Sequence, residues 1–507
     1  MKRLFLVLAV TCLMFTSEAS SELAGPQQAS QVCRNWLTFI VEQEGHWAHS
    51  EAPQISRVEE VFFEDILLGY CFEIEPAGYV LVPTLMQLSP IKATSQSSTF
   101  DTWAEGGFSL LIREILHDRY QRYSNQHGEA ALPLTTKNHK AWQRFLLDDN
   151  EFRSNLSPLN QKDSSRNGPL LTTAWHQGPP YNDFCPMGDG GDLCIVGCVA
   201  TAIAQVMAYH GSPYAGEGHH QYYWTGDGTC GGVPRPDNLV ADFNDPYEFD
   251  LMPDICTMDD PQRIRDAVAE LCYEVGVSVN MNYGVCWSGS NTALAQIVLP
   301  QYFRYHDVAR LAQRSDYDAR QWFNLIQSDI DRSLPLLYSF ALDGGGGHAV
   351  VCDGWRQGAG IDQIHLNYGW ADSHTAWYAL DDIYASVDPQ QEKIVYNIQP
   401  GPDEVSGIVS ERLPLQRLSL SASPNPFNPR TSIRFSLTER STVSLRIFDS
   451  AGRLVAVLLE GVELAPGNHT VDWSGKNSAG RGVASGTYFL RVEDGLNVGF
   501  SQITLVR

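Results

Sequence analysis

Basic residues are scarce in this chain of 507 residues. It has 35 lysines and arginines against 59 aspartates and glutamates, a formal net charge of −24 at pH 7. Nucleic acids and anionic membranes are held largely through lysine and arginine contacts to phosphate, so the charge argues against both as partners. Residues 168–400 contain 10 basic against 29 acidic residues, whereas residues 415–507 contain 10 against 7. This shift indicates a domain boundary between the two segments.

Long hydrophobic runs are also lacking beyond the start of the chain. Two basic residues precede an apolar run from Leu4 to Phe15, and the small residues Ser17 and Ala19 follow. This pattern predicts a secretory signal peptide over residues 1–19. The run is too short to cross a bilayer, and no later segment resembles a membrane span. We therefore expect a secreted or cell-surface protein.

Cysteine is missing from residues 353–507. One of the eleven cysteines, Cys12, lies inside the predicted signal, which leaves ten where disulfides can persist. If one of the ten is a free nucleophile, at least one more stays unpaired or pairs between chains, and spacing does not reveal the connectivity. The loss of cysteine and the change in charge meet at residues 401–414, where the proline- and glycine-containing start is typical of a linker.

Two short segments predict a nucleophilic pair. Residues 197–202 open an alanine-rich apolar helix with Cys198 in its first turn, where the helix dipole favours a thiolate. Residues 344–351 are four glycines, His348 and an apolar strand, which would hold an imidazole on a rigid element that a substrate can approach. Taken alone, Cys198 is as well explained as an ordinary core cysteine.

Two further side chains complete the predicted chemistry. Residues 349–352 and 364–368 are expected to pair as strands across a turn, bringing Asn367 towards His348 as a hydrogen-bond acceptor for the imidazole. An ordinary strand or turn residue is the alternative for Asn367. Acyl transfer also needs donors to the oxyanion, which the backbone N–H of Cys198 and the amide of Gln177 would supply. Spacing alone does not single out Gln177 among the glutamines.

Four motifs in this region resemble the streptopain family (C10) of papain-like cysteine peptidases. They occur in the family's order over residues 168–400, and they are Leu171–Asn182 with Cys185-Pro186, Gly197–Ala202 with Gln205–Met207, Gly346–Val350, and His365–Trp370. The resemblance implies a papain-like α+β domain.

The same resemblance implies roles for individual residues. Cys198 would be the nucleophile, His348 the general base and then acid, and Gln177 the side-chain donor of the oxyanion hole. Asn367 would lie beside the histidine, and Gly347 and Trp370 would contact substrate. Tyr368 stands where the family usually has a first tryptophan, which bears on the orientation of His348 but not on the Cys–His pair.

An insert, residues 187–194, precedes the nucleophile and marks a second departure from the family. A bridge between Cys185 and Cys194 would leave Cys198 free. A zinc site at Cys185, Cys194 and Cys198 with His210 would have no familiar ligand spacing. A solvated acidic loop explains Asp189 and Asp192 better than a calcium site does. No cofactor and no metal are expected.

Residues 20–167 resemble the family's pro-domain. They are predicted to form a small α+β domain with an amphipathic helix carrying Trp36, Phe39 and Ile40, a strand at residues 78–82 and a helix at residues 108–115. The resemblance implies a zymogen whose own pro-domain covers the active site as an inhibitor. The polar stretch over residues 154–168 lacks periodicity, and we expect it to be exposed and to contain the processing site.

Residues 415–507 are predicted to form an all-β sandwich. Polar and apolar residues alternate over residues 432–437, 443–448 and 486–492 between turn signals. Residues 424–429, 449–453 and 485–488 resemble the immunoglobulin-like module related to FlgD on secreted bacterial enzymes. The resemblance implies a role in export or surface sorting, with the secretion machinery as partner; a passive spacer is the alternative.

These features together predict a secreted bacterial cysteine endopeptidase made as a zymogen. It would hydrolyse peptide bonds in proteins and peptides through a thioester, without a cofactor. The alternative is a surface-displayed binding or adhesion protein on a silent peptidase fold. The joint presence of Cys198, His348 and Gln177 argues against it, because a decayed site has no physical need for all three.

Overall fold

The chain forms two compact units, which divide between Asp403 and Glu404. The computed structural model describes residues 23–103, 107–126, 137–159, 165–188, 191–226, 235–342, 346–371, 375–380, 392–401, 420–437, 440–449, 454–478, 480–493 and 498–506. The predicted signal peptide and, apart from Gly401, the predicted linker lie outside these residues. Among the described helices, none combines the length and the apolar character that a membrane crossing requires.

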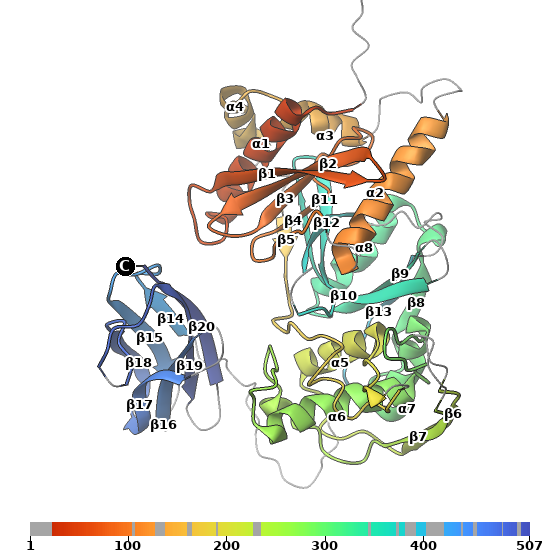
Figure 1. Cartoon of the computed structure of the whole chain (residues 1–507), viewed down its shortest axis with the longest axis vertical. Coiled ribbons are helices and arrows are strands. Elements are labelled where there is room, and N and C mark those ends of the chain that lie inside the picture. The colour runs from red at the N-terminus through yellow and green to blue at the C-terminus, as the bar shows by residue number, and fades with distance from the viewer. Residues whose placement is uncertain are drawn as a thin grey trace, which may run out of the picture. The chain divides into compact units, whose positions relative to one another are not determined.

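The first unit is built on one sheet of eleven strands (Figure 1). Its strand order is β1-β2-β3-β4-β12-β11-β10-β9-β13-β8, with β5 paired to β10. The strands are β1 (Gln54–Phe63), β2 (Ile66–Glu75), β3 (Tyr79–Pro83), β4 (Ala93–Ser95), β5 (Ser165–Asn167), β8 (Arg310–Gln313), β9 (Leu336–Leu342), β10 (Gly346–Gly358), β11 (Ile361–Asn367), β12 (Ala376–Ala379) and β13 (Lys393–Tyr396). The predicted pairing of β10 with β11 is confirmed, with Val351 opposite Asn367.

Helices flank this sheet. Those before the sheet's central strands are α1 (Pro26–Glu44), α2 (Gly107–Gln126), α3 (Lys137–Phe145) and α4 (Asp149–Leu159). Those of the central region are α5 (Cys198–His210), α6 (Gln262–Ser278), α7 (Ala295–Tyr302) and α8 (Ala319–Ile330), and a separate hairpin is formed by β6 (His219–Trp224) and β7 (Asp237–Asp242). As predicted, α1 buries Trp36, Phe39 and Ile40, and α5 begins at Cys198.

The N-terminal region shares its sheet and its core with the central region. Strand β4 pairs with β12, where Thr94 lies opposite Trp377. One hydrophobic cluster joins Leu81 and Ile112 of the N-terminal region to Tyr338 and Tyr378 of the central region. The sequence predicted a small separate domain that ends at residue 167. In the structure, the strands before and after residue 167 belong to one sheet, because β4 and β12 pair with each other and neither is left as a free edge.

The stretch over residues 154–168 is more regular than predicted, whereas its predicted exposure is confirmed at Ser154, Asn155, Ser165 and Arg166. Residues 154–159 complete α4, in which Leu156 is buried, and residues 165–167 form β5. Leu156 packs in the cluster of α1 and α3, and β5 gains ladder hydrogen bonds from β10. Tertiary contacts therefore order both ends of a sequence that has no periodicity of its own.

A buried arginine joins the N-terminal region to the central sheet. The guanidinium of Arg356 on β10 lies 5.1 Å from the ring centre of Trp36 and 4.5 Å from that of Trp377. It also pairs with Glu44 of α1 at 3.5 Å. Burial lowers the pKa of Arg356 to about 9, and Glu44 opposes this effect. A buried charge without these partners would be strongly unfavourable.

We expect Arg356→Met to lower the free energy of unfolding of the first unit by about 3 kcal/mol, because the change removes one partner of a buried pair and two cation–π contacts. Chemical denaturation measures this. Arg57→Met, at an exposed ion pair with Glu59, is the control and should change the free energy by less than about 0.5 kcal/mol. If the two changes lower the free energy of unfolding equally, apolar packing alone holds the N-terminal region against the central sheet.

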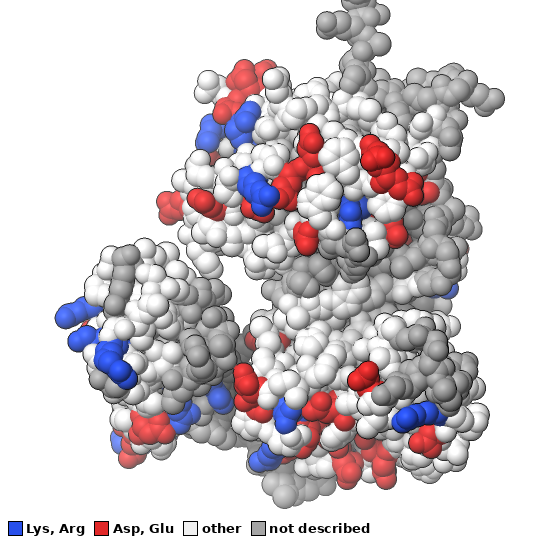
Figure 2. All heavy atoms as spheres, in the orientation of Figure 1, with Lys and Arg blue, Asp and Glu red and all other residues white. Residues whose placement is uncertain are grey.

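A buried carboxyl group lies on α6, which packs with α5 in a second hydrophobic cluster. Glu274 accepts a hydrogen bond of 2.5 Å from the hydroxyl of Tyr247. Burial raises the pKa of Glu274 to about 8, and the nearby Glu270 and Asp245 add to the rise. Figure 2 shows acidic side chains gathered over this part of the first unit. The folded state therefore favours the protonated carboxyl group.

The free energy of unfolding should therefore fall as pH rises from about 5 to 8. The unfolded chain loses the Glu274 proton near its ordinary pKa of 4.5, whereas the folded chain keeps it to about 8, which gives a slope of up to about 1.4 kcal/mol per pH unit. Glu274→Gln should reduce this slope in denaturation measured across that range. Glu51→Gln, at an exposed glutamate, should not, and equal slopes in all three proteins would contradict the assignment.

The second unit is a sandwich of two antiparallel sheets. One has the order β14-β15-β18 and the other β17-β16-β19-β20. The strands are β14 (Leu420–Ser423), β15 (Thr431–Leu437), β16 (Ser441–Asp449), β17 (Leu454–Leu464), β18 (Gly467–Trp473), β19 (Gly486–Glu493) and β20 (Val498–Leu505). Ile433 of the first sheet and Leu445 and Leu490 of the second share one core. The predicted alternation is confirmed in β15, β16 and β19.

Candidate active site

A cleft of about 1140 Å³ lies in the first unit. Five of the six predicted site residues line it, namely Cys198, His348, Gln177, Gly347 and Trp370. The sixth, Asn367, does not. One wall comes from residues 286–292, and another from strands β9, β10 and β13. The fold thus brings together side chains that lie up to 193 positions apart in the sequence.

Cys198 opens α5 and faces β10. The preceding Gly197 has φ of 91°, and a Cβ there would lie 2.6 Å from the sulfur of Met281, so only glycine fits this turn. Burial raises the pKa of the Cys198 thiol, and hydrogen bonds from the backbone N–H groups of Ala349, Val199 and Cys198 oppose the rise. Burial therefore opposes the effect of the helix terminus, which was expected to favour a thiolate.

The ring of His348 is held by a backbone carbonyl group. Its Nε2 lies 3.1 Å from the carbonyl oxygen of Tyr368, and the residue is 8% exposed. Since a carbonyl oxygen only accepts, Nε2 carries the hydrogen in the neutral ring. Nδ1 is then the nitrogen that can take up a proton.

Aromatic rings surround the imidazole. Tyr368 stacks on it with ring centres 5.5 Å apart and an interplanar angle of 24°, and Trp370 lies at 4.5 Å and 37°. Phe340 approaches edge-on at 6.0 Å. The tyrosine that replaces the family's first tryptophan therefore covers the ring and fixes its tautomer through its own carbonyl group.

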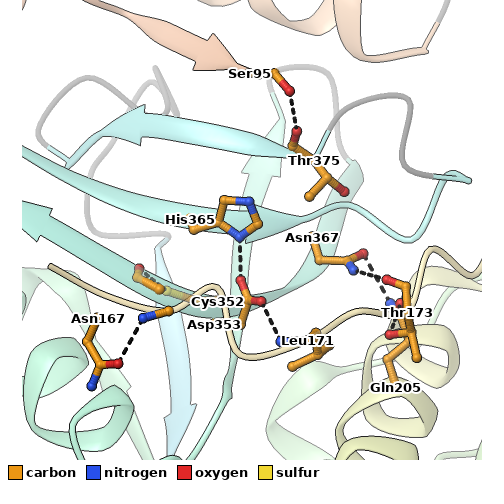
Figure 3. Close-up of polar contacts among 12 residues, drawn as sticks. Ser95, Asn167, Leu171, Thr173, Gln205, Cys352, Asp353, His365, Asn367 and Thr375 are labelled. Carbon is orange, nitrogen blue, oxygen red and sulfur yellow. Dashed lines mark hydrogen bonds and ion pairs between the residues drawn. The ribbon is translucent and has the colours of Figure 1, made fainter. Parts of the chain in front are cut away.

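Asn367 was predicted to accept a hydrogen bond from the imidazole of His348, and the hydrogen bonds that the structure shows for its amide join other segments. Its Nδ2 donates to the carbonyl oxygen of Thr173 at 2.6 Å, and its Oδ1 accepts from Gln205 at 3.3 Å (Figure 3). The same Oδ1 also accepts from the backbone N–H of Gly369 at 3.0 Å. Gln205 also accepts from the Thr173 hydroxyl at 2.9 Å. Asn367 thus ties the segment before Gln177 to β11 and α5.

A second set of contacts that the sequence analysis missed holds the same segment. The carboxylate of Asp353 lies 2.6 Å from Nδ1 of His365 and accepts from the backbone N–H of Leu171 at 2.9 Å (Figure 3). The Asp353 carbonyl oxygen accepts from Leu170 at 2.9 Å. Asp353 directly follows the apolar run of residues 349–352. Its position in the sequence could have indicated these contacts, because a buried carboxylate needs partners.

Gln177 projects from this anchored segment into the cleft. Its backbone carbonyl oxygen accepts from Val196, two residues before Cys198, at 3.0 Å. Among the described residues its side-chain amide has no hydrogen-bond partner. The amide is therefore available to a ligand in the cleft.

Several predicted features near the cleft have different outcomes. Cys185 is a free, buried thiol, so the expected bridge to Cys194 is not formed. Cys286, in the cleft wall, is disulfide-bonded. Gly344, Gly345 and Asp189 lie outside the described residues.

Comparison with known proteins assigns the two units. Residues 175–378 match the Peptidase C10 family. The central region is thus similar to this family over less than half of the chain. Residues 427–495 match the FlgD Ig-like domain. Both assignments confirm the resemblances drawn from the sequence.

The C10 relatives cover different parts of the chain. Thiol protease/hemagglutinin PrtT of Porphyromonas gingivalis is 27% identical over 274 residues, which are 52% of this chain and 30% of PrtT. Streptopain of Streptococcus pyogenes is 24% identical over 363 residues, 69% of this chain and 84% of streptopain. A solved fragment of Prevotella intermedia prointerpain A is 22% identical, with a TM-score of 0.51 over 68% of this chain and all of the fragment. This likeness confirms the papain-like fold.

Asn367→Ala should loosen the segment that carries Gln177. The change leaves the Thr173 carbonyl and the Gly369 amide without their partner, which costs about 2 kcal/mol of unfolding free energy. Hydrogen exchange should become faster at residues 173–178 and at Gly369. Asn238→Ala, at an exposed asparagine, is the control, and unchanged exchange in the Asn367 variant would contradict the positioning role.

Proposed function

We propose that this protein is a cysteine endopeptidase with Cys198 as nucleophile and His348 as general base and acid. One observation carries the proposal: both residues line one cleft, where the residue after His348 donates its backbone N–H to the Cys198 sulfur. The match of residues 175–378 to the Peptidase C10 family supports it. The chain spans only 30% of PrtT, so the activity is inferred from the site itself.

The geometry supports a two-step acyl transfer. Nδ1 of His348 takes the proton of the Cys198 thiol as the sulfur attacks the peptide carbonyl carbon, since the raised thiol pKa requires a base. The backbone N–H of Cys198 and the amide of Gln177 would bind the oxyanion. The imidazolium then protonates the leaving amine, and water attacks the thioester with the same base. Trp370 and Tyr368 would keep the ring in place.

We further propose that residues 20–167 act as a pro-domain that inhibits the enzyme. None of their described residues is among those that line the cleft. They contact the sheet beyond the site, where the hydroxyls of Ser95 and Ser98 donate to the Thr375 carbonyl oxygen at 3.2 and 3.3 Å. Restraint of the segment after Trp370 is then the route by which the pro-domain would act on the site.

The outer parts of the chain support an exported enzyme. The residue pattern before Ala19 is that of a signal peptide, and the second unit matches the FlgD Ig-like domain. We propose that residues 1–19 direct export and that residues 415–507 serve secretion or surface sorting. Protein or peptide substrates would then be met outside the cell.

Incubation of the full-length protein under mild reduction tests the proposal. The chain should be cleaved between α4 and β5, at residues 160–164, and should then hydrolyse casein. A Cys198→Ala variant should hydrolyse casein at least about 10³-fold more slowly. Mass spectrometry and casein hydrolysis over time measure both changes.

Labelling with a thiol-directed peptidase inhibitor adds a matched control. It should be lost in Cys198→Ala and kept in Cys256→Ala, because Cys256 is buried outside the cleft. If the wild-type chain stays inert and unlabelled even after an added protease removes the N-terminal region, the protein is instead a binding or adhesion protein on a silent fold.

A further inference from the structure

A row of residues crosses the sheet beside His348 and forms one side of the cleft. Ala349 on β10 is paired with Ser339 on β9, Ser339 with Lys393 on β13, and Lys393 with Gln313 on β8. Paired residues on adjacent antiparallel strands point to the same face of a sheet. All four line the cleft. The row therefore leads from the residue next to His348 outward along the cleft to Lys393.

Lys393 brings a positive charge to this cleft. The described lining includes no aspartate or glutamate, and Lys393 is its one lysine or arginine. Lys393 is half-buried, and no ion pair to it occurs within the described residues. A half-buried ammonium group without a counter-ion favours an anionic ligand more than an exposed one does.

The preceding residue, Glu392, does not neutralise Lys393. Glu392 lies on the opposite face of the sheet, where it accepts a hydrogen bond of 2.6 Å from the Tyr338 hydroxyl. Burial raises the pKa of Glu392 to about 7, and the basic groups that oppose this rise are Arg314, Arg119 and Lys92. Lys393 is not among them. The strand alternation thus leaves its charge directed at the cleft.

From this geometry we infer that Lys393 selects substrates with an acidic side chain close to the scissile bond. Two strand spacings place its Cα about 10 Å from that of Ala349, and an extended substrate advances about 3.3 Å per residue. The selected glutamate or aspartate is therefore within about three residues of the bond that is cut. The inference rests on the proposed peptidase function and names its substrate class.

The overall negative charge of the protein does not oppose this selection at close range. Surface charges are screened over about 8 Å at physiological ionic strength, whereas a side chain bound in the cleft would touch the ammonium group. The competing role for Lys393 is apolar, because the methylene stem of a lysine can cover an apolar substrate side chain while its charge stays in water. The two roles predict opposite substrate preferences.

A peptide series separates them. Fluorogenic peptides carry Glu, Gln, Leu or Lys at one of the three positions on either side of the cleaved bond, and kcat/KM is measured for each with the processed enzyme. At one position the wild type should prefer Glu to the equally sized Gln by about fivefold or more. Lys393→Met should remove this preference, Lys393→Arg should keep it, and Lys393→Glu should shift it to Lys. Arg320→Met, at an exposed arginine on α8, is the charge-matched control and should behave as wild type.

The outcomes distinguish this inference from the proposed function. If cleavage depends on Cys198 but the ratio of kcat/KM for the Glu and Gln peptides is the same in wild type and Lys393→Met, the inference is wrong and the proposed function stands. A preference for Leu at every position would lead to the same conclusion. Absence of both cleavage and inhibitor labelling in the wild type overturns both. If a Lys393 variant fails to fold, the wild type alone can test the inference. Its ratio of kcat/KM for the Glu and Gln peptides should decrease when salt is raised from 50 mM to 0.5 M, and a constant ratio would rule out an ion pair.

Discussion

The antiparallel pairing of β10 with its neighbours is the constraint on which the rest of the first unit depends. β10 carries His348 at one end, and pairing with β11 brings back Tyr368, whose carbonyl group holds the imidazole. Pairing with β9 builds the row that leads to Lys393. Further along the same strand, Arg356 binds the N-terminal region. The position of His348, the row that leads to Lys393 and the contact with the N-terminal region thus all depend on one strand.

The candidate site is held by polar contacts that never touch the reacting atoms. Asn367 and Asp353 fix the segment before Gln177, because a loop with buried backbone groups needs partners for them. The backbone carbonyl group of Tyr368 accepts the hydrogen bond from His348 that was predicted for the side-chain amide of Asn367. This arrangement accounts for the tolerance of tyrosine at position 368, since the contact to the imidazole does not depend on the side chain.

The site and the fold differ in how much of each could be predicted. The helix opened by Cys198, the β10–β11 pair and the sandwich strands were predictable, because each rests on local periodicity and turn residues. The partners of Asn367, the Asp353–His365 contact and the ordering of residues 165–167 were not. Each joins segments that are distant in sequence, and a short polar stretch carries no signal of the strand that will pair with it.

Local sequence by itself determined the motifs, the type of each long element and the C-terminal sandwich, because hydrophobic alternation and glycine positions act over a few residues. Only the tertiary structure decided that the strands of the N-terminal region continue the central sheet. It also decided that burial raises the pKa of the Cys198 thiol and that Lys393 lines the same cleft as His348. Strand order and burial set these outcomes, and both arise only when distant segments pack together.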